Sequence, residues 1–278
     1  MSELRILTAT RYVQPLREGG SLPAIVDTDG DGLFVAKFRG AGQGAKALIA
    51  ELIVGLIARE LELPTPDLAL INIPEEFGRS EPDPEIQDLL RASHGVNFGM
   101  RYLDGAFNFE TTAAEECITN DLAARIVWLD AFVSNPDRTH RNPNLLIWNR
   151  KPWLIDHGAA LYAHHDWPSV NEERTRSPFP LVKDHVLLSR ADDLESIDSE
   201  FAAALTSEAI SRVVSKVPDE LLRDKVIAGD FPDAKSARKR YVDYLTTRLE
   251  SPRVFVAEAI EARKRVKRTK PRRVAARR

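Results

Sequence analysis

The sequence predicts an α+β protein in two parts, a small N-terminal sheet with one helix and a larger, mainly helical C-terminal part. Two patterns lead to this prediction. Short apolar runs separated by turn residues fill residues 4–38, whereas helical patterns punctuated by prolines predominate over residues 192–261. With 278 residues, the chain is long enough to bury either one large core or two moderate ones.

The N-terminal strands are expected at residues 5–13, 16–26 and 33–38. The Asp-Gly pairs at residues 29–32 separate two apolar alternating runs, which is typical of a β-hairpin. A helix is then predicted over residues 46–63, because the apolar residues fall at helical spacing until Pro64 and Pro66 stop the helix.

The middle of the chain predicts a strand at residues 69–74 and a short helix at residues 85–93. We interpret residues 74–94 as a connector, with the crossing between the two parts near residue 100. An amphipathic helix is expected over residues 113–133, with its apolar face formed by Leu122, Ile126, Leu129 and Val133.

The sequence pattern changes from helical to loop and strand after this helix. A polar, proline-interrupted loop leads to two short apolar strands at residues 145–148 and 153–155, joined by a turn, and the second strand runs into Asp156, His157 and Gly158. Two strands that return on each other bring the residues at their ends close together. We therefore expect the carboxylates and amides of this region to form one site.

The overall composition is that of a soluble globular protein. Hydrophobic residues make up 43% of the chain, and the formal net charge is −3. Cys117 is the only cysteine, which excludes an intrachain disulfide and a zinc site built on paired thiolates. The chain has neither an apolar signal segment nor a run of about 18 apolar residues. We expect a cytoplasmic protein without a membrane span.

The C-terminal residues 263–278 carry ten basic residues and no acidic one. We expect a flexible basic tail there, and two interpretations of it stay open: a solvated tail with no dedicated partner, or a segment that binds nucleic acid or another anionic surface. The expected organisation is thus an N-terminal lobe at residues 1–100, a C-terminal lobe at residues 101–262, and the tail.

The polar residues occur in the order that phosphoryl transfer needs. That chemistry uses a lysine on the phosphates, an aspartate near the attacking hydroxyl, and an Asn and an Asp that hold Mg²⁺. Lys37 ends an apolar strand in a V-A-K pattern, and Asp137 and Asn142 are spaced five residues apart, as in a kinase catalytic loop. Asp156 follows at the end of the hairpin. Carboxylate and amide oxygens suit Mg²⁺.

The segments NPDRTHRNPNLL and LIDHG resemble the HipA-like kinase family, which is distantly similar to phosphoinositide kinases with their D-R-x-x-x-N and I-D-x-G motifs. The resemblance extends to Lys37, to ELIVGLIARELELPTP and to NFGMRYLDGA, and so covers residues 4–165. It implies a two-lobed, protein-kinase-like fold. It also implies ATP- and Mg²⁺-dependent transfer of the γ-phosphoryl group to a hydroxyl, most often of a protein serine or threonine.

The resemblance also implies roles for individual residues. Lys37 would contact the nucleotide phosphates, Glu51 would pair with Lys37, and Asp137 would be the catalytic aspartate. Met100 and Tyr102 would belong to the hinge that meets the adenine.

Asp156 would be one magnesium ligand, and the second would be one of two asparagines. The five-residue spacing from Asp137 favours Asn142, whereas Asn144 directly precedes the apolar strand, where a metal-binding asparagine usually stands. Arg138 and Arg141 would either neutralise phosphate or anchor the loop to the C-terminal helices.

Two glycine-rich segments are candidates for a loop that cradles phosphates through backbone N–H groups. The first contains Gly19, Gly20 and Ser21 and precedes the Lys37 strand, so it is favoured. The second, residues 39–44, lies just before the helix that contains Glu51. Neither matches the motif of a protein kinase or of a Walker loop.

Several functions stay open at this point. The acceptor can be a protein or a small molecule or lipid, since relatives of the same architecture phosphorylate each of these. A kinase-like scaffold that binds nucleotide without turnover is the alternative from a different class.

Overall fold

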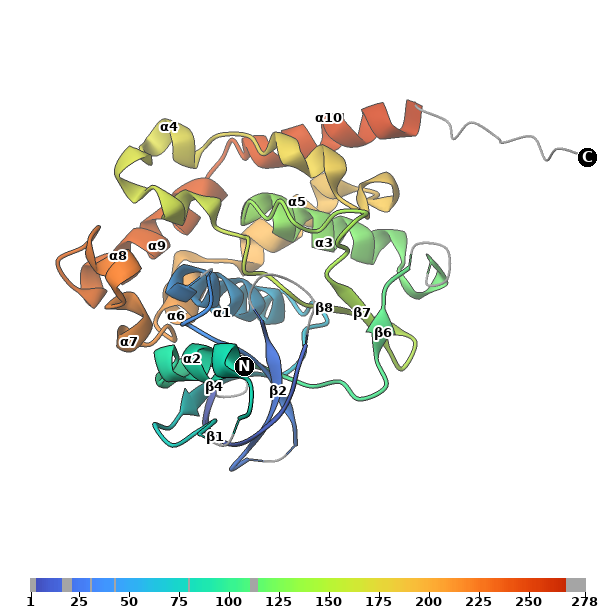
Figure 1. The fold of residues 1–278 in the computed structure, drawn as a ribbon. Coiled ribbons are helices and arrows are strands. Elements are labelled where there is room, and N and C mark those ends of the chain that lie inside the picture. The colour runs from blue at the N-terminus through green and yellow to red at the C-terminus, as the bar shows by residue number, and fades with distance from the viewer. Residues whose placement is uncertain are drawn as a thin grey trace, which may run out of the picture.

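The structure is a computed structural model, and it describes residues 4–16, 22–30, 32–42, 44–79, 81–110 and 115–268. The predicted mixture of helix and strand is confirmed (Figure 1). Strands predominate in the first part of the chain and helices in the second.

The five N-terminal strands close into a barrel in the order β1-β2-β3-β5-β4. β1 pairs with β2 antiparallel and with β4 parallel, and the other pairs in the barrel are antiparallel. The predicted hairpin is confirmed, because β2 and β3 pair across the Asp-Gly segment. Asp29 Oδ1 accepts a hydrogen bond from the Thr8 amide at 2.7 Å beside that turn. The strands are β1 (Arg5–Pro15), β2 (Ala24–Thr28), β3 (Phe34–Lys37), β4 (Leu68–Ile73) and β5 (Gly95–Arg101).

Strand β3 is buried on both faces because it lies between the barrel interior and helix α1 (Gly44–Glu60). Phe34 and Ala36 belong to the apolar cluster inside the barrel, whereas Val35 belongs to the cluster that contains α1. Side chains alternate along a strand, so Lys37 follows Val35 onto the α1 side.

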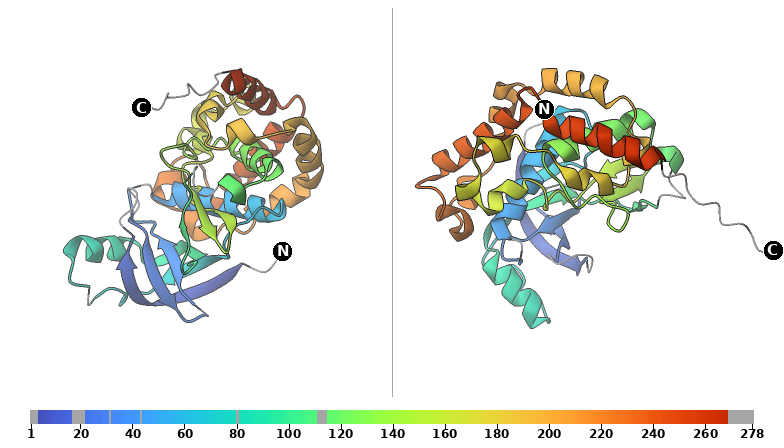
Figure 2. Two further views of the ribbon diagram at one scale, coloured as in Figure 1. Left: turned by 90° about the vertical axis from the view of Figure 1, so that its right-hand side faces the viewer. Right: turned by 90° about the horizontal axis from the view of Figure 1, so that it is seen from above.

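Helix α1 runs through the middle of the molecule, between the barrel and the C-terminal helices (Figures 1 and 2). It contacts β4 and β5 on one side. On the other side it contacts α6 (Ser207–Val214), α7 (Asp219–Leu222) and α8 (Lys225–Ala228). Its residues are therefore apolar and buried on nearly all sides, as expected of an enclosed helix. Gly55 permits the close approach to the barrel, since a Cβ there would lie 2.8 Å from Leu68 Cδ1.

The interpretation of residues 74–94 as a connector between the two parts is wrong. β4 and β5 pair along their length, from Leu68 with Met100 to Ile73 with Gly95, so the section between them leaves the barrel and returns to it. It contains helix α2 (Pro84–Ala92), whose Leu90 packs on the cluster inside the barrel. The chain leaves the barrel only after β5, near the predicted residue 100.

A second, three-stranded antiparallel sheet follows the barrel, in the order β6-β7-β8. The predicted hairpin is β7–β8, and its two turn residues Asn149 and Arg150 have φ values of 50° and 61°. Such left-handed pairs match the twist of the flanking strands. Pro152 lies on β8, an edge strand, where its missing N–H costs no ladder bond. The strands are β6 (Phe107–Asn108), β7 (Leu145–Trp148) and β8 (Lys151–Leu154).

Helix α3 (Asn120–Phe132) is shorter and more buried than the predicted helix at residues 113–133. It begins after Thr119, whose side chain accepts a hydrogen bond from the Leu122 amide at 3.1 Å and so caps the helix. It is not amphipathic, because other elements cover it on several sides. These are α5 (Leu194–Ala204), α10 (Val254–Arg268) and the 3-10 helices η4 (Pro180–Asp184) and η5 (Leu188–Arg190). Trp128 stacks on Phe132 with ring centroids 5.2 Å apart.

The C-terminal part is mainly helical, as predicted. Besides α3 it contains α4 (Glu172–Thr175), α5 (Leu194–Ala204), α6 (Ser207–Val214), α7 (Asp219–Leu222), α8 (Lys225–Ala228), α9 (Ala234–Leu249) and α10 (Val254–Arg268). Single 3-10 turns are η1 (Glu115–Cys117), η2 (Tyr162–His165), η3 (Trp167–Ser169), η4 (Pro180–Asp184) and η5 (Leu188–Arg190).

The prediction that a flexible tail begins at Arg263 is wrong for its first residues, because helix α10 continues to Arg268. Ala259 and Ala262 are buried on the helix face that packs against the protein, and Arg263 forms an ion pair with Asp192. The rest of the predicted tail lies outside the described residues. The division at residue 100 into two domains stays a prediction.

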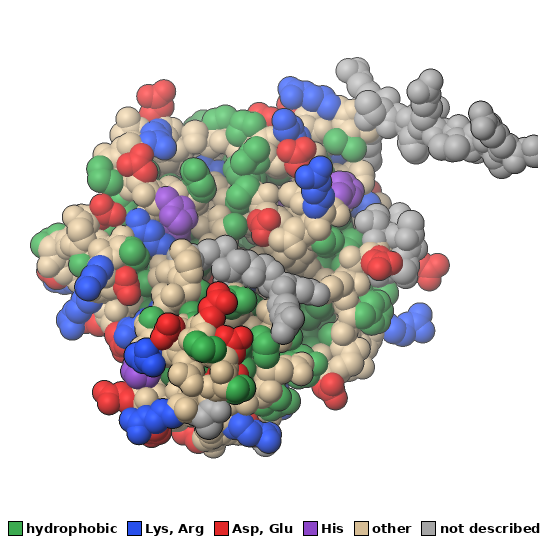
Figure 3. Space-filling model, viewed as in Figure 1, with side chains coloured by type: hydrophobic (Ala, Val, Ile, Leu, Met, Phe, Trp, Pro, Cys, Tyr) green, Lys and Arg blue, Asp and Glu red, His purple; other side chains and the backbone are tan. Residues whose placement is uncertain are grey.

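No helix in the described part of the chain combines the length and the apolar character that crossing a bilayer requires. On the face shown in Figure 3, acidic and basic side chains are interspersed.

Acid should destabilise the protein through buried histidines such as His164. Burial, together with the charges of His165 and Lys46, holds the pKa of His164 well below its ordinary value. The unfolded state therefore binds a proton near pH 6.5 that the folded state does not, and stability falls as pH drops below that value. Between pH 6.5 and 5 this single group should cost about 2 kcal/mol of unfolding free energy.

Urea unfolding at several pH values tests this expectation. His164→Gln removes the titrating group and retains a hydrogen-bonding partner for Tyr241, whose hydroxyl lies 3.2 Å from His164 Nδ1. The variant should lose less stability on acidification than the wild type. Equal slopes of stability against pH in the two proteins would contradict the expectation.

Candidate functional site

Lys37, at the end of β3, is held by two carboxylates. Its Nζ donates to Glu51 Oε1 at 2.5 Å and to Asp156 Oδ1 at 2.7 Å. The side chains of Lys37 and Glu51 are 8% and 1% exposed, so the pair is shielded from water, whereas the Asp156 side chain is 42% exposed. The predicted pairing of Lys37 with Glu51 is thus present, and Asp156 joins it.

Glu51 connects three parts of the chain from its place on α1. Oε1 accepts from Lys37 on β3, and Oε2 accepts from the backbone amide of His157 at 3.0 Å. Both oxygens of a buried carboxylate are therefore bonded, as a charge in an apolar helix requires. The helix, the barrel strand and the segment after β8 meet at this one side chain.

The ion cluster shifts the pKa of each member. Burial disfavours the ammonium of Lys37, but the charges of Glu51 and Asp156 outweigh it and raise the pKa of Lys37. Burial would raise the pKa of Asp156, yet the ion pair with Lys37 lowers it. Burial raises the pKa of Glu51, and the negative charge of Asp156 adds to this effect, so that the opposing charge of Lys37 is outweighed. The cluster joins one cationic side chain to two carboxyl groups.

Asp156 has an unusual backbone conformation, with φ of 55°. Left-handed φ values are strained for a residue with a side chain, at a cost of order 1–3 kcal/mol, and they concentrate at functional sites. Asn144 has φ of 48° in the loop before β7. Asn and Asp tolerate this region better than most residues, so the sequence suits the geometry.

Asp137 lies in the loop between α3 and β7 and meets both candidate asparagines. Asp137 Oδ2 accepts from Asn142 Nδ2 at 2.8 Å and from Asn144 Nδ2 at 3.1 Å. In both cases the amide nitrogen, not the oxygen, faces Asp137. The predicted catalytic aspartate and both predicted ligands are therefore neighbours.

Asn144 is placed closer to Asp156 by the backbone than Asn142 is. The Asn144 carbonyl accepts from the Ile155 amide at 3.1 Å, so Asn144 lies opposite the residue that precedes Asp156. Asn144 is buried, whereas Asn142 is exposed. The geometry favours Asn144 as the partner of Asp156, against the spacing argument that favoured Asn142.

The structure chooses between the two roles considered for Arg138. Its side chain is buried and forms an ion pair with Asp130 on α3, with Arg138 Nε 2.6 Å from Asp130 Oδ2. Arg138 therefore anchors the loop to a C-terminal helix and does not reach out to neutralise phosphate. Arg141 is exposed, so nothing in its burial ties it to the C-terminal helices.

Sequence reasoning missed Asp130, Asn135 and His185, which surround Arg138. Asp130 is completely buried and accepts from Asn135 Nδ2 and His185 Nε2, both at 2.9 Å. The sequence did contain a signal for a buried ion pair at Asp130, since this charged residue lies inside the apolar run IVWLDAFV. Its partner could not be inferred, because His185 is 55 residues away in sequence.

The predicted hinge residues lie at the end of β5. Met100 pairs with Val35 and Leu68 and is buried in the cluster that contains α1. The Tyr102 amide donates to the Leu33 carbonyl at 2.9 Å, just where the chain leaves the barrel. Both residues are thus beside β3, the strand that carries Lys37.

The predicted phosphate loop with Gly19, Gly20 and Ser21 lies outside the described residues. Residue 16 and residue 23 on either side of it are joined by a backbone bond of 2.7 Å, so the loop connects β1 with β2. The second glycine-rich segment leads from β3 to α1, and Gly44 begins the helix with φ of 63°.

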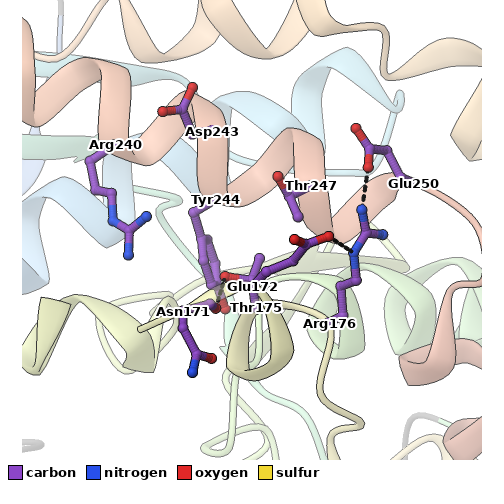
Figure 4. A pocket seen from close by; sticks show the side chains of 9 residues that line it. All are labelled: Asn171, Glu172, Thr175, Arg176, Arg240, Asp243, Tyr244, Thr247 and Glu250. Carbon is purple, nitrogen blue, oxygen red and sulfur yellow. Dashed lines mark hydrogen bonds and ion pairs between the residues drawn. The ribbon is translucent and has the colours of Figure 1, made fainter. Parts of the chain in front are cut away.

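A cavity of about 290 Å³ between α4 and α9 is separate from these residues (Figure 4). Its Arg176 is bonded to Glu172 and Glu250, and Arg240 donates to the Val170 carbonyl, so the cations in its lining are already paired. The lining consists of Asn171, Glu172, Thr175, Arg176, Arg240, Asp243, Tyr244, Thr247 and Glu250.

A family model described as HipA-like kinase matches residues 10–227. The chain belongs to the HipA-like kinase family. This membership supports a kinase activity, and the match includes Lys37, Glu51, Asp137 and Asp156.

A solved structure of similar fold is the crystal structure of the proinflammatory kinase CtkA from Helicobacter pylori. It aligns with a TM-score of 0.54 at 10% sequence identity, over 93% of this HipA-like chain and 99% of that chain. At such low identity the likeness shows the fold alone. Among curated proteins, none matches this chain.

Asp130→Asn should destabilise the protein strongly. Burial works to raise the pKa of Asp130, but the Arg138 guanidinium and the His185 hydrogen bond outweigh it and lower that pKa, so the carboxylate is charged. Removing one partner of a buried ion pair costs about 3–5 kcal/mol. Denaturant unfolding at neutral pH should show a loss of that size.

Asp121→Asn is the matched control. Asp121 also pairs with an arginine, Arg125, one turn away on the surface of α3, and its side chain is 63% exposed. Exposed pairs contribute about 0.2–1 kcal/mol. Similar losses of unfolding free energy in Asp130→Asn and Asp121→Asn would show that the buried ion pair contributes no more to stability than the exposed pair does.

Proposed function

We propose that the protein is an ATP- and Mg²⁺-dependent kinase that transfers the γ-phosphoryl group to a hydroxyl, with a protein serine or threonine as the favoured acceptor. One observation carries the proposal: Lys37, Glu51 and Asp156, from three separate parts of the chain, converge in one ion cluster. We propose further that the barrel and the C-terminal helices act as two lobes, with ATP between them.

The chemistry of the side chains suits a nucleotide phosphate and Mg²⁺. Asp156 offers a carboxylate and Asn144 an amide oxygen, and oxygen ligands are those Mg²⁺ prefers. The exposed Asp156 side chain is accessible to a ligand from solvent. The described residues hold no cluster of three or more His, Cys, Asp or Glu side chains that could bind a metal ion, so the amide would have to contribute.

Each residue then has a role in positioning and charge neutralisation, which account for most of phosphoryl-transfer catalysis. Lys37 would donate to phosphate oxygens, with Glu51 holding its ammonium in place. Asp137 would orient the acceptor hydroxyl and take its proton. Mg²⁺, when bound, would offset the negative charge of the phosphates, and Asn144 and Asp156 would hold it.

Turnover of ATP with Mg²⁺ tests the proposal. The wild type should transfer labelled phosphate, and Asp137→Asn and Asp156→Ala should each reduce the rate by at least about 100-fold, since each removes a group that acts on the reacting atoms. Asp137→Asn should leave ATP affinity nearly unchanged. The labelled residue, identified by mass spectrometry, would show whether serine or threonine is the acceptor.

The control is Asp243→Asn, because Asp243 pairs with Lys239 on the surface of α9, and the variant should not affect turnover. Asn144→Ala should raise the Mg²⁺ requirement more than Asn142→Ala does. ATP binding without turnover, unchanged by Asp137→Asn, would favour a kinase-like scaffold. Label found only on added lipid or small molecules would favour those acceptors.

We also propose that the basic residues at the C-terminus bind an anionic partner such as nucleic acid. The support is their charge, ten basic residues and no acidic one over residues 263–278. Binding to a DNA oligonucleotide should weaken steeply between 50 and 200 mM salt and disappear in a chain that ends at residue 268. Equal binding by the full and shortened chains would refute a role for the last ten residues.

A further inference from the structure

Arg138 has five bonds from a side chain that is 1% exposed. Nε donates to Asp130 Oδ2 at 2.6 Å, and the guanidinium also contacts the ring nitrogen Nδ1 of His157 at 3.3 Å. Three more bonds go to the backbone carbonyls of Pro143 at 3.5 Å, Asn144, and Ile155 at 3.3 Å. All three carbonyls share the two N–H groups of Nη1, so the guanidinium bonds through each of its three nitrogens, which the single nitrogen of a lysine could not do.

These bonds join the two segments that hold the proposed metal ligands. The carbonyl of Asn144 belongs to one ligand itself, whereas Ile155 and His157 flank the other ligand, Asp156. The guanidinium is a rigid plane, so it sets the separation of the two segments more strictly than the single Ile155–Asn144 backbone bond does.

Asp130 and His185 fix the position of the Arg138 side chain, because Asp130 accepts from both Arg138 and His185. The Leu187 amide donates to His185 Nδ1 at 3.0 Å, so this neutral imidazole carries its proton on Nε2 and donates it to Asp130 at 2.9 Å. Asp130 therefore receives donors from Asn135, Arg138 and His185.

His157 extends the same network to Lys37. Its ring accepts from Arg138 and its backbone amide donates to Glu51, which in turn pairs with Lys37. Helix α3, the Asp137 loop, the segment after β8 and helix α1 are thus connected by continuous polar bonds.

We propose that Arg138 is a positioning residue for phosphoryl transfer, which sets the distance between Asn144 and Asp156 through its bonds to the carbonyls of Asn144 and Ile155 and to the ring of His157. The role in phosphoryl transfer rests on the proposed function, whereas the bonds of Arg138 do not. Arg138 itself touches no substrate. Its loss should therefore weaken the use of Mg²⁺ more than the binding of metal-free ATP.

The test compares Arg138→Lys with Arg248→Lys. Arg248 is likewise buried, at 3% exposure, and its guanidinium donates to carbonyls of Ala131, Phe132, Thr175 and Ser177. None of these four acceptors belongs to the site. The two variants therefore lose a comparable buried arginine, one inside the network and one outside it.

Two measurements are made on each folded variant. The first is the half-saturating Mg²⁺ concentration and kcat at saturating ATP. The second is amide hydrogen exchange by NMR at Ile155 and His157, whose amides donate to Asn144 and Glu51, and this readout needs neither turnover nor ligand.

Arg138→Lys should raise half-saturating Mg²⁺ by roughly 10- to 100-fold, the range seen when groups behind metal ligands are removed, and should accelerate exchange at both amides. Arg248→Lys should leave the half-saturating Mg²⁺ concentration and the exchange rates of the two amides at wild-type values. This should hold even if Arg248→Lys lowers the unfolding temperature as much as Arg138→Lys does. Equal changes in the two variants, or unchanged Mg²⁺ use and exchange in Arg138→Lys, would overturn the proposal.

A milder pair of variants covers the case in which Arg138→Lys does not fold. His157→Leu removes the ring acceptor for Arg138 and should raise the half-saturating Mg²⁺ concentration. His164→Leu removes a buried histidine that bonds Tyr241 outside this network, and it should leave that concentration unchanged. The two proposals fail separately: a wild type without turnover refutes the proposed function, while unaltered amide exchange in the Arg138 and His157→Leu variants refutes the positioning role.

Discussion

The arrangement of the whole molecule depends on how the charge of Lys37 is satisfied. A lysine that is almost fully buried needs carboxylates at hydrogen-bond distance, because an unpaired charge in an apolar interior costs many kcal/mol. Glu51 on α1 and Asp156 after β8 supply them. Strand β3, helix α1 and the end of the second sheet must therefore stay together whenever the protein is folded.

The packing around helix α1 keeps Glu51 close to Lys37. Helix α1 lies between the barrel and the C-terminal helices, so Glu51 cannot move away from Lys37 without opening an apolar interface. The Asp130–Arg138 pair does the same for the other half of the site, since it ties the Asp137 loop to α3. Both pairs are buried, and their value lies in the specific arrangement that they impose more than in net stability.

The residues that deviate from local preference are those of the site. Asp156 and Asn144 have left-handed φ values, Glu51 is a charge in an apolar helix, and one ammonium serves two carboxylates. Natural sequences agree with their folds at most positions, and exceptions are expected where function requires them. In the proposed kinase, Mg²⁺ and the nucleotide phosphates would replace part of the internal pairing between Lys37 and Asp156.

The sequence by itself determined the features that depend on neighbours along the chain. Turn residues and alternation predicted both hairpins, and Pro64 predicted that the helix stops before it, which α1 does at Glu60. The motifs around Asp137 and Asp156 named candidate residues that the structure brings close to one another. Only the tertiary structure decided features that depend on how separate elements meet. Arg138 is an anchor because Asp130 on α3 is opposite it, and Asn144 is favoured over Asn142 because Ile155 pairs with it. For the same reason α2 returned to the barrel and α10 extended past Arg263, since their apolar faces are covered by elements far away in sequence.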